Sequence, residues 1–450
     1  MEKDLTHGSV LKNIIFFSLP YLLSYFLQTL YGLADLYIIG QFNGTNQITS
    51  VSIGSQIMHM ITVMIVGLAM GTTVTIGQAI GAKHQKKAAN IIGNTATLFM
   101  LLSIIITFLL LLTRHNIVSV MSTPPESVKG TTDYLTVCFI GIPFITAYNI
   151  ISSIFRGMGD SKSPMYFIAI ACAFNIVLDY IFIGSMDLGP AGAALGTTIA
   201  QTISVIIAFI MISKKKQELS LTKECFKPFA PIISQILRIG IPVSLQDGFI
   251  QISFILITII VNRRGVNDAA AVGIVEKIIS FVFLVPSSML SAVSAISAQN
   301  IGAGKPKRAE QTLHYAILIC ICFGAVISTT VQFKSEAIIA LFDKNPQVIA
   351  LGSQYIKSYI FDCIFAGMHF SFSGYFCALG KSGISFLHNS LSIILVRIPG
   401  AYLMSKWFPY TLFPMGLAAT TGSLLSVIIC VIAFIIIKRR GSINASKSVV

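Results

Sequence analysis

The sequence predicts an all-α integral membrane protein of twelve transmembrane helices, arranged as two pseudo-symmetric six-helix lobes. Three observations predict it: the composition, the long apolar runs and an internal repeat. Of 450 residues, 54% are hydrophobic and only 11% are charged, and the mean hydropathy is +0.81. Soluble domains carry roughly 25% charged residues. A chain with so few charges has to face lipid over much of its surface.

Twelve apolar runs are each long enough to cross a bilayer, which takes about 20 residues per helix. They fill the chain and leave no length for a separate soluble domain. The start, MEKDLTHGSV, has no signal-peptide pattern, so we expect the first run to stay as an anchor. The predicted spans are 14–39, 48–73, 89–112, 131–155, 164–184, 191–213, 236–261, 272–297, 313–333, 354–376, 384–404 and 414–437.

The loop charges predict the orientation. Lys and Arg exceed Asp and Glu by 14, and the positive-inside rule places basic loops in the cytoplasm. The N-terminal tail, every second loop and the C-terminal tail together hold 20 Lys and Arg, against 8 on the other side. We therefore expect both termini, and the long loop at 214–235, to be cytoplasmic.

The two halves of the chain resemble each other at an offset of about 221 residues. GQAIGAKHQKKAA (77–89) aligns with AQNIGAGKPKRAE (298–310), and Pro20 aligns with Pro242. Each half holds six spans, so both have the same orientation, as in the parallel repeats of transporters. We expect a cleft between two lobes that rock. The predicted parts are an N-terminal lobe (1–213), a linker (214–235), a C-terminal lobe (236–437) and a tail (438–450).

No motif indicates an ATPase, a hydrolase or a metal site. The sequence lacks G-x-x-x-x-G-K-[ST], H-E-x-x-H and G-x-S-x-G. Its eight cysteines form no C-x-x-C pair or Cys/His cluster, so neither a disulfide framework nor a zinc site is expected. Transport would draw on an ion gradient, and we expect no cofactor.

Polar residues inside the N-terminal spans are the main site candidates, because an ionisable group at the bilayer centre costs at least about 2.5–3.5 kcal/mol. Spacing i, i+4 puts two of them, on the fifth span, on one helix face. Oxygen ligands of this kind suit a proton or a sodium ion. The alternative is a hydrogen-bond network that only locks the helices together. The candidates are Asp35, Asn175, Asp179 and Thr197.

The C-terminal spans carry a different polar set, which forms a candidate substrate site or a structural polar site. Arg397 aligns with Asn175 of the first half. It either contacts substrate or serves as the buried partner of an acid such as Glu276 or Asp362. The set is Asp247, Gln251, Glu276 and Arg397.

Proline lies within the first span, at Pro20, and in the matching seventh span. Proline removes a backbone hydrogen bond and bends a helix. Because the first span also carries Asp35, with Gly32 nearby, Pro20 and Gly32 form a candidate hinge. A static kink is the alternative, and the sequence does not separate the two.

In these residues and in several longer motifs, the chain resembles the multidrug and toxic compound extrusion (MATE) family of secondary transporters. It is most similar to the DinF-like branch of that family. The resemblance covers nearly all of the chain and is carried by LADLYIIG, GQAIGAKHQKKA with its repeat AQNIGAGKPKRA, FRGMGDSKSP, NIVLDYIFIG, GAALGTTIAQ and VRIPGAYL. It implies twelve helices in two lobes around a V-shaped cleft. It also implies export of cationic or amphipathic drugs in exchange for protons or sodium.

The resemblance also implies roles for residues. Asp35 matches the family's first-helix aspartate, and Pro20 matches the proline proposed to bend on protonation. Asn175, Asp179 and Thr197 match the cation pocket of the N-terminal lobe. Where the sodium-linked branch has acids in the C-terminal lobe, this chain has Ile250 and Met368. The resemblance therefore favours coupling in the N-terminal lobe, to H⁺ first and Na⁺ second.

We therefore expect a multidrug efflux antiporter, not an enzyme, in the inner (plasma) membrane of a bacterium. Its partners would be small cationic or amphipathic substrates and membrane lipid, with no nucleic acid, and the chain would act as a monomer. Two other classes stay open: a flippase or exporter of a lipid-linked or amphipathic metabolite, and an intramembrane enzyme.

Overall fold

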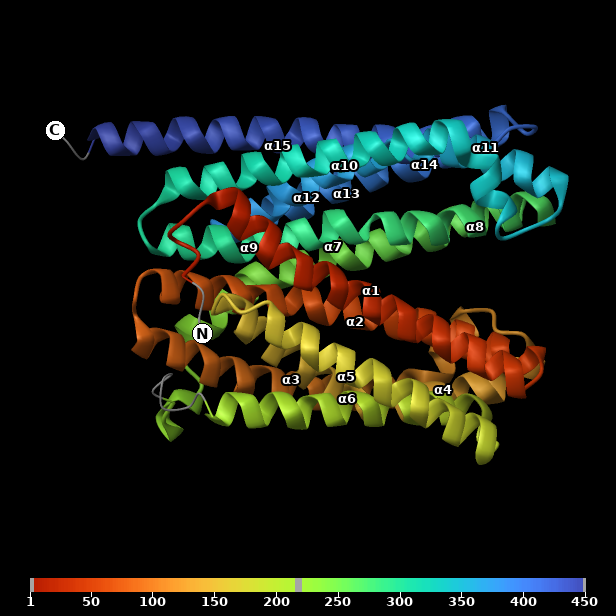
Figure 1. The fold of residues 1–450 in the computed structure, drawn as a ribbon, viewed down its shortest axis with the longest axis horizontal. Coiled ribbons are helices and arrows are strands. Elements are labelled where there is room, and N and C mark those ends of the chain that lie inside the picture. The colour runs from red at the N-terminus through yellow and green to blue at the C-terminus, as the bar shows by residue number, and fades with distance from the viewer. Residues whose placement is uncertain (1–3, 215–220, 448–450) are drawn as a thin grey trace. The chain divides into compact units, whose positions relative to one another are not determined.

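The computed structural model describes residues 4–214 and 221–447, and within them all regular structure is helical (Figure 1). Parts of the predicted linker (215–220) and tail (448–450) lie outside the described residues. The elements are α1 (Val10–Phe42), α2 (Thr45–Gly81), α3 (Gln85–Val120), α4 (Pro125–Gly157), α5 (Lys162–Asp179), the π-helix η1 (Tyr180–Ser185), α6 (Gly189–Lys214), the 3₁₀-helix η2 (Lys223–Phe226), α7 (Ala230–Asn262), α8 (Val266–Val282), α9 (Leu284–Gly302), α10 (Pro306–Ala340), α11 (Pro346–Tyr359), α12 (Asp362–Ala378), α13 (Ser382–Ser392), the π-helix η3 (Ile393–Arg397), α14 (Ile398–Trp407) and α15 (Phe413–Lys447).

The predicted all-α membrane fold is confirmed, although not every predicted span is one regular helix. The span 272–297 divides between α8 and α9, and the span 384–404 contains the π-helix η3. In the described chain, eleven helical stretches are long and apolar enough to cross a membrane. The predicted span 354–376 is not one continuous helix, because it divides between α11 and α12. Ile360 and Phe361 join the two pieces and are themselves apolar, without glycine or proline, so hydropathy gave no sign of the break.

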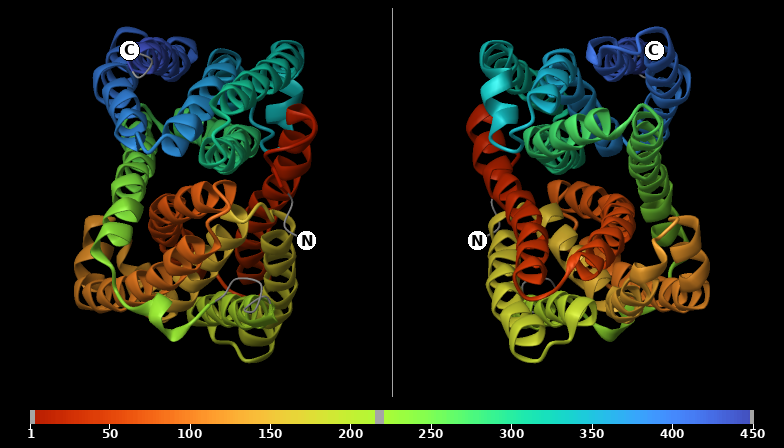
Figure 2. Two further views of the ribbon diagram at one scale, coloured as in Figure 1. Left: turned by 90° about the vertical axis from the view of Figure 1, so that its left-hand side faces the viewer. Right: turned by 90° about the vertical axis from the view of Figure 1, so that its right-hand side faces the viewer.

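The chain forms two compact units. The first contains Met1–Gly8, Ile15–Ser244 and Ala298–Lys305, and the second contains Ser9–Ile14, Leu245–Ser297 and Pro306–Val450. Within the first unit α4 packs against α2, α3 and α6, and α5 packs against α6 (Figure 2). Within the second, α15 packs against α11, α12 and α14, and α10 packs against α12. The predicted lobe boundaries, at 213 and 236, stay a prediction.

The repeated loop motifs contact each other inside the first unit. A Cβ atom on Gly81 would collide with the backbone of Gln299, and one on Gly302 would collide with the backbone of Gln78. Only glycine, which has no side chain, allows two helix ends to approach this closely at both positions. The repeat Gln-x-x-Gly thus has a packing reason, since each copy makes room for the other.

The N-terminal segment docks beside these loops. The side chain of Leu5 is fully buried, its N–H donates to Gln299 Oε1 at 3.3 Å, and Lys305 Nζ donates to the carbonyl of Thr6 at 2.9 Å. Although burial opposes it, hydrogen bonds from Thr6 and the neighbouring His7 lower the pKa of Asp4 to about 2. The hydrogen bonds with Gln299 and Lys305 therefore hold the N-terminal segment against the second copy of the repeated loop motif.

Candidate cation-binding site

Three helices of the first unit bring the four predicted N-terminal residues into one cluster. Asp35 comes from α1, Asn175 and Asp179 from α5, and Thr197 from α6. Asn175 Nδ2 donates to Thr197 Oγ1 at 3.3 Å, and Thr197 Oγ1 donates to Asp35 Oδ2 at 3.2 Å. The i, i+4 spacing on α5 points both of its residues toward this chain of hydrogen bonds.

Asp179 is fully buried next to the Asp35 carboxyl, and the two carboxyl groups interact electrostatically. Two local features explain its position. The π-helix η1 begins at the next residue, and π segments displace side chains from the regular helix register and often occur at functional sites. On α6, Gly196 leaves the space that Asp179 Oδ1 occupies, since a Cβ atom there would collide with that oxygen.

The cluster contains more hydrogen-bond acceptors than donors. The buried oxygens without a partner are Asp35 Oδ1, Asn175 Oδ1, both carboxyl oxygens of Asp179 and Gln201 Oε1. Over the described residues, the groups that act on the two carboxyls include no Lys or Arg. Buried acceptors cost free energy unless they receive a hydrogen bond or a cation. The chemistry of these atoms therefore fits a small cation.

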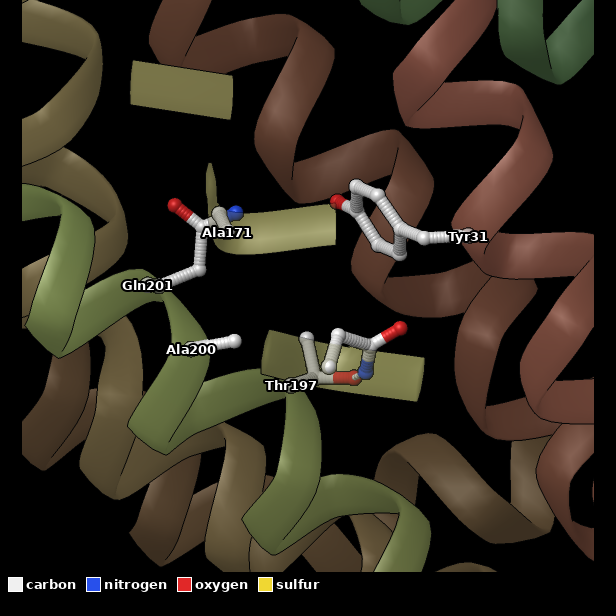
Figure 3. Close-up of a pocket in the computed structure, with 6 residues that line it drawn as sticks. Tyr31, Ala171, Thr197, Ala200 and Gln201 are labelled. Atoms are coloured by element: carbon white, nitrogen blue, oxygen red, sulfur yellow. Dashed lines mark hydrogen bonds between the residues drawn. The ribbon is translucent and has the colours of Figure 1, made fainter. Parts of the chain in front are cut away.

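A small pocket adjoins the cluster (Figure 3). Tyr31 reaches into it from α1, opposite Thr197 and Gln201 on α6. The other lining residues are Ala171, Asn175 and Ala200. Sequence reasoning missed Tyr31 and Gln201, although a signal existed: each lies four residues from a predicted site residue on its own helix, Tyr31 before Asp35 and Gln201 after Thr197.

The candidate hinge residues lie on the same helix as Asp35. Pro20 is within α1, and the helix continues past it without a break. A Cβ atom on Gly32 would meet nothing within 4 Å, so close packing is not the reason for glycine there.

The C-terminal polar residues do not form one cluster. Arg397, at the end of η3, is buried, and its Nη2 donates to Tyr359 Oη at 2.7 Å. Its guanidinium also lies 4.7 Å from the ring centroid of Phe254. Glu276 and Asp362 act on it electrostatically, yet in the part of the chain that is described neither forms an ion pair with it. The hydrogen-bond partner of Arg397 is thus a tyrosine hydroxyl, while the two acids act on it at longer range.

Asp247 and Gln251 both lie on α7, and among the described residues no interaction joins Asp247 to Arg397. The thiol of Cys377 is close enough to Asp247 to interact with it. The neighbouring Gln246, which the sequence gave no reason to select, is 1% exposed, and both its amide oxygen and its amide nitrogen lack a partner. The predicted set therefore divides into an Arg397 group and an Asp247 group.

The described residues contain no group of three or more His, Cys, Asp or Glu side chains that could hold a metal ion. A cation at the N-terminal cluster would instead be bound by two carboxyls with amide and hydroxyl oxygens. Oxygen ligands suit hard cations such as sodium.

An all-helical membrane fold with an internal repeat and a buried polar site in one half is typical of a multi-pass membrane transporter. The MatE family model matches the chain twice, over residues 20–181 and again over residues 242–403. The chain belongs to this family, and the predicted repeat is confirmed, with Pro20 and Pro242 at the start of the two matched stretches.

Curated relatives and solved structures agree with this assignment. The chain is 30% identical over 405 residues to the probable multidrug resistance protein YpnP of Bacillus subtilis (strain 168), covering 90% of each chain. It is 25% identical to the multidrug export protein MepA of Staphylococcus haemolyticus, covering 98% of this chain and 96% of that one. It has the fold of a multidrug resistance MATE transporter solved in an outward-facing conformation, with a TM-score of 0.89 and 22% identity over 99% of this chain and 98% of that one.

Proposed function

We propose that this chain is a multidrug efflux antiporter that exports cationic or amphipathic compounds in exchange for H⁺ or Na⁺, with the coupling cation at Asp35 and Asp179. The observation that carries the proposal is the surplus of buried acceptor oxygens around two adjacent carboxyls, on which no Lys or Arg of residues 4–214 and 221–447 acts. The names of the relatives, probable multidrug resistance protein and multidrug export protein, support the substrate class.

The electrostatics of the pair give the coupling its physical basis. Two neighbouring carboxylates strongly attract a cation when no water screens their charges. One proton shared between the carboxyls, or one sodium ion held also by Asn175 and Thr197, would neutralise much of that repulsion. Binding would draw α1 and α5 together through Asp35 and Asp179, and release would let them separate.

The position of Asp35 on α1 connects this change with transport. Tyr31 lies one helical turn before Asp35 on the same face of α1, so a substrate that contacted α1 at Tyr31 would act on the helix that carries Asp35. Cation binding and substrate binding would then compete for the arrangement of α1. Because the two ligands act on one element, each changes the affinity for the other, as coupled exchange requires.

The test is efflux of an ethidium-like dye from vesicles that contain the protein, under separately imposed proton and sodium gradients. We expect Asp35→Asn and Asp179→Asn each to abolish gradient-driven efflux, because each removes a carboxyl that must take up the cation. Asp133→Asn is the matched control, since Asp133 is an exposed acid on the spanning helix α4, outside the cluster. Full coupled efflux by the double variant would refute the site.

A further inference from the structure

A second buried ionic feature of the first unit lies outside the cation cluster. Arg156, near the end of α4, is only 7% exposed. Its guanidinium carbon lies 4.2 Å from the ring centroid of Tyr21 on α1. The sequence placed Arg156 in a basic loop and gave it no role, whereas the structure places it inside the protein against an aromatic ring.

The surroundings of Arg156 are aromatic and not acidic. Tyr21, Tyr25 and Tyr148 are the groups that act on its charge. In residues 4–214 and 221–447, no carboxylate lies within ion-pair distance of it. A cation over a ring face gains about 0.5–1 kcal/mol at exposed sites and about 2 kcal/mol when it is shielded from water. The ring of Tyr21 therefore contributes to stabilising this buried charge.

The ring that Arg156 contacts belongs to the residue directly after Pro20. Proline cannot donate the backbone hydrogen bond to the carbonyl four residues earlier, so α1 is weakest at this turn. Ser24 Oγ donates a hydrogen bond to the carbonyl oxygen of Pro20 at 2.8 Å, so this carbonyl has a side-chain donor next to the weakened turn. The stack on Tyr21 thus fastens α1 to α4 at the start of its second segment.

We propose that Arg156 is a positioning residue for α1: by stacking on Tyr21 it sets the direction in which the helix leaves Pro20 and thereby the place of Asp35. Asp35 lies fourteen residues beyond Tyr21, about 21 Å along a regular helix. A small rotation at Tyr21 becomes a displacement of ångströms at the carboxyl. The inference deepens the proposed function, on which its transport consequence rests.

The conformational part can be tested without transport. Spin labels are attached to Leu33→Cys on α1, close to Asp35, and to Lys162→Cys on α5, both exposed positions in the first unit, in a protein whose exposed Cys322 is replaced by Ser. The distance between the labels is measured by pulsed EPR. We expect one narrow distance distribution in the otherwise unchanged protein, in Tyr21→Phe, which keeps a ring, and in Arg156→Lys, which keeps a cation. In Tyr21→Leu and Arg156→Met we expect a second population of molecules at a different label-to-label distance. This population should be roughly ten times larger than any such population in the unaltered protein.

Transport by the same variants tests the consequence. We expect gradient-driven dye efflux to fall roughly tenfold in Tyr21→Leu and Arg156→Met and to stay near its original rate in Tyr21→Phe and Arg156→Lys. Lys406→Met is the matched control, because Lys406 also lies over a tyrosine ring, 4.7 Å from the centroid of Tyr402 in the second unit. It should change neither the distances nor the efflux.

Each outcome bears on a different claim. Unchanged distances in Tyr21→Leu and Arg156→Met overturn the positioning role, whatever the efflux shows. If the unaltered protein shows no efflux under either gradient, the proposed function is refuted. The distance measurement then still tests the positioning role of Arg156. If Arg156→Met does not fold, the comparison of Tyr21→Leu with Tyr21→Phe still gives the answer, since it removes the ring and leaves the cation in place.

Discussion

At the scale of single residues, the cation cluster depends on the absence of a side chain as much as on the carboxyls. Asp179 Oδ1 occupies the space where a Cβ atom on Gly196 would lie. Gly192 and Gly196 have the small-x-x-x-small spacing that lets helices approach closely in membranes. At Gly196 the space left by the missing side chain holds a carboxyl group.

We therefore expect Gly196→Ala to displace Asp179 and to abolish coupled dye efflux while the helical fold remains. Overpacking of this kind costs about 1–3 kcal/mol, which a protein of this size survives. Gly273→Ala is the matched control, because a Cβ atom on that helical glycine would meet nothing within 4 Å. The measurements are efflux under an imposed gradient and helix content by circular dichroism. Normal efflux by Gly196→Ala would mean that the Asp179 position is not needed.

At the scale of elements, one arginine holds together the end of the second unit where α14 leads into α15. Arg264 follows α7 and has a guanidinium that donates to five groups. Nε donates to Asp268 Oδ1 at 3.1 Å. The two terminal nitrogens donate to four carbonyl oxygens, one in the last turn of α14 and three in the loop between α14 and α15. Those carbonyls belong to Ser405, Phe408, Pro409 and Thr411.

We expect Arg264→Lys to lower the melting temperature in detergent, because an ammonium group cannot reproduce the planar fork of donors. Hydrogen bonds to charged groups contribute about 1.5–3 kcal/mol each, so the loss of even one should be visible in the unfolding transition. Arg263→Lys is the control, since the neighbouring Arg263 is exposed. Equal melting temperatures for the two variants would contradict the bracing role of Arg264.

Sequence reasoning succeeded where burial in lipid leaves few choices. A carboxyl in an apolar span must meet polar partners, so Asp35 and Asp179 could be paired before any coordinates existed. It failed where backbone geometry decides. The break between α11 and α12 lies at two apolar residues, and nothing in their composition marks it. For Arg397 the sequence offered either a substrate contact or an acidic partner, and it gave no sign of the hydrogen bond to the hydroxyl of Tyr359.

At the scale of the whole molecule, the identity of the coupling ion should appear in the stability of the protein. A ligand that binds the folded state alone stabilises it by RT ln(1 + [L]/Kd), which is about 2.7 kcal/mol at a concentration of 100 Kd. If Na⁺ binds at Asp35 and Asp179, melting in NaCl should occur above melting in KCl or choline chloride at equal ionic strength. The double variant Asp35→Asn, Asp179→Asn should lose that difference.

Proton coupling predicts a different pattern in the same measurement. The unaltered protein should then melt at one temperature in all three salts, because none of their cations fits the site better than the others. Its melting temperature should still vary with pH in a way that the double variant does not share, since the asparagines cannot take up a proton. A sodium effect of equal size in both proteins would place sodium binding outside the cluster, and a pH dependence common to both would remove the two aspartates from the coupling step.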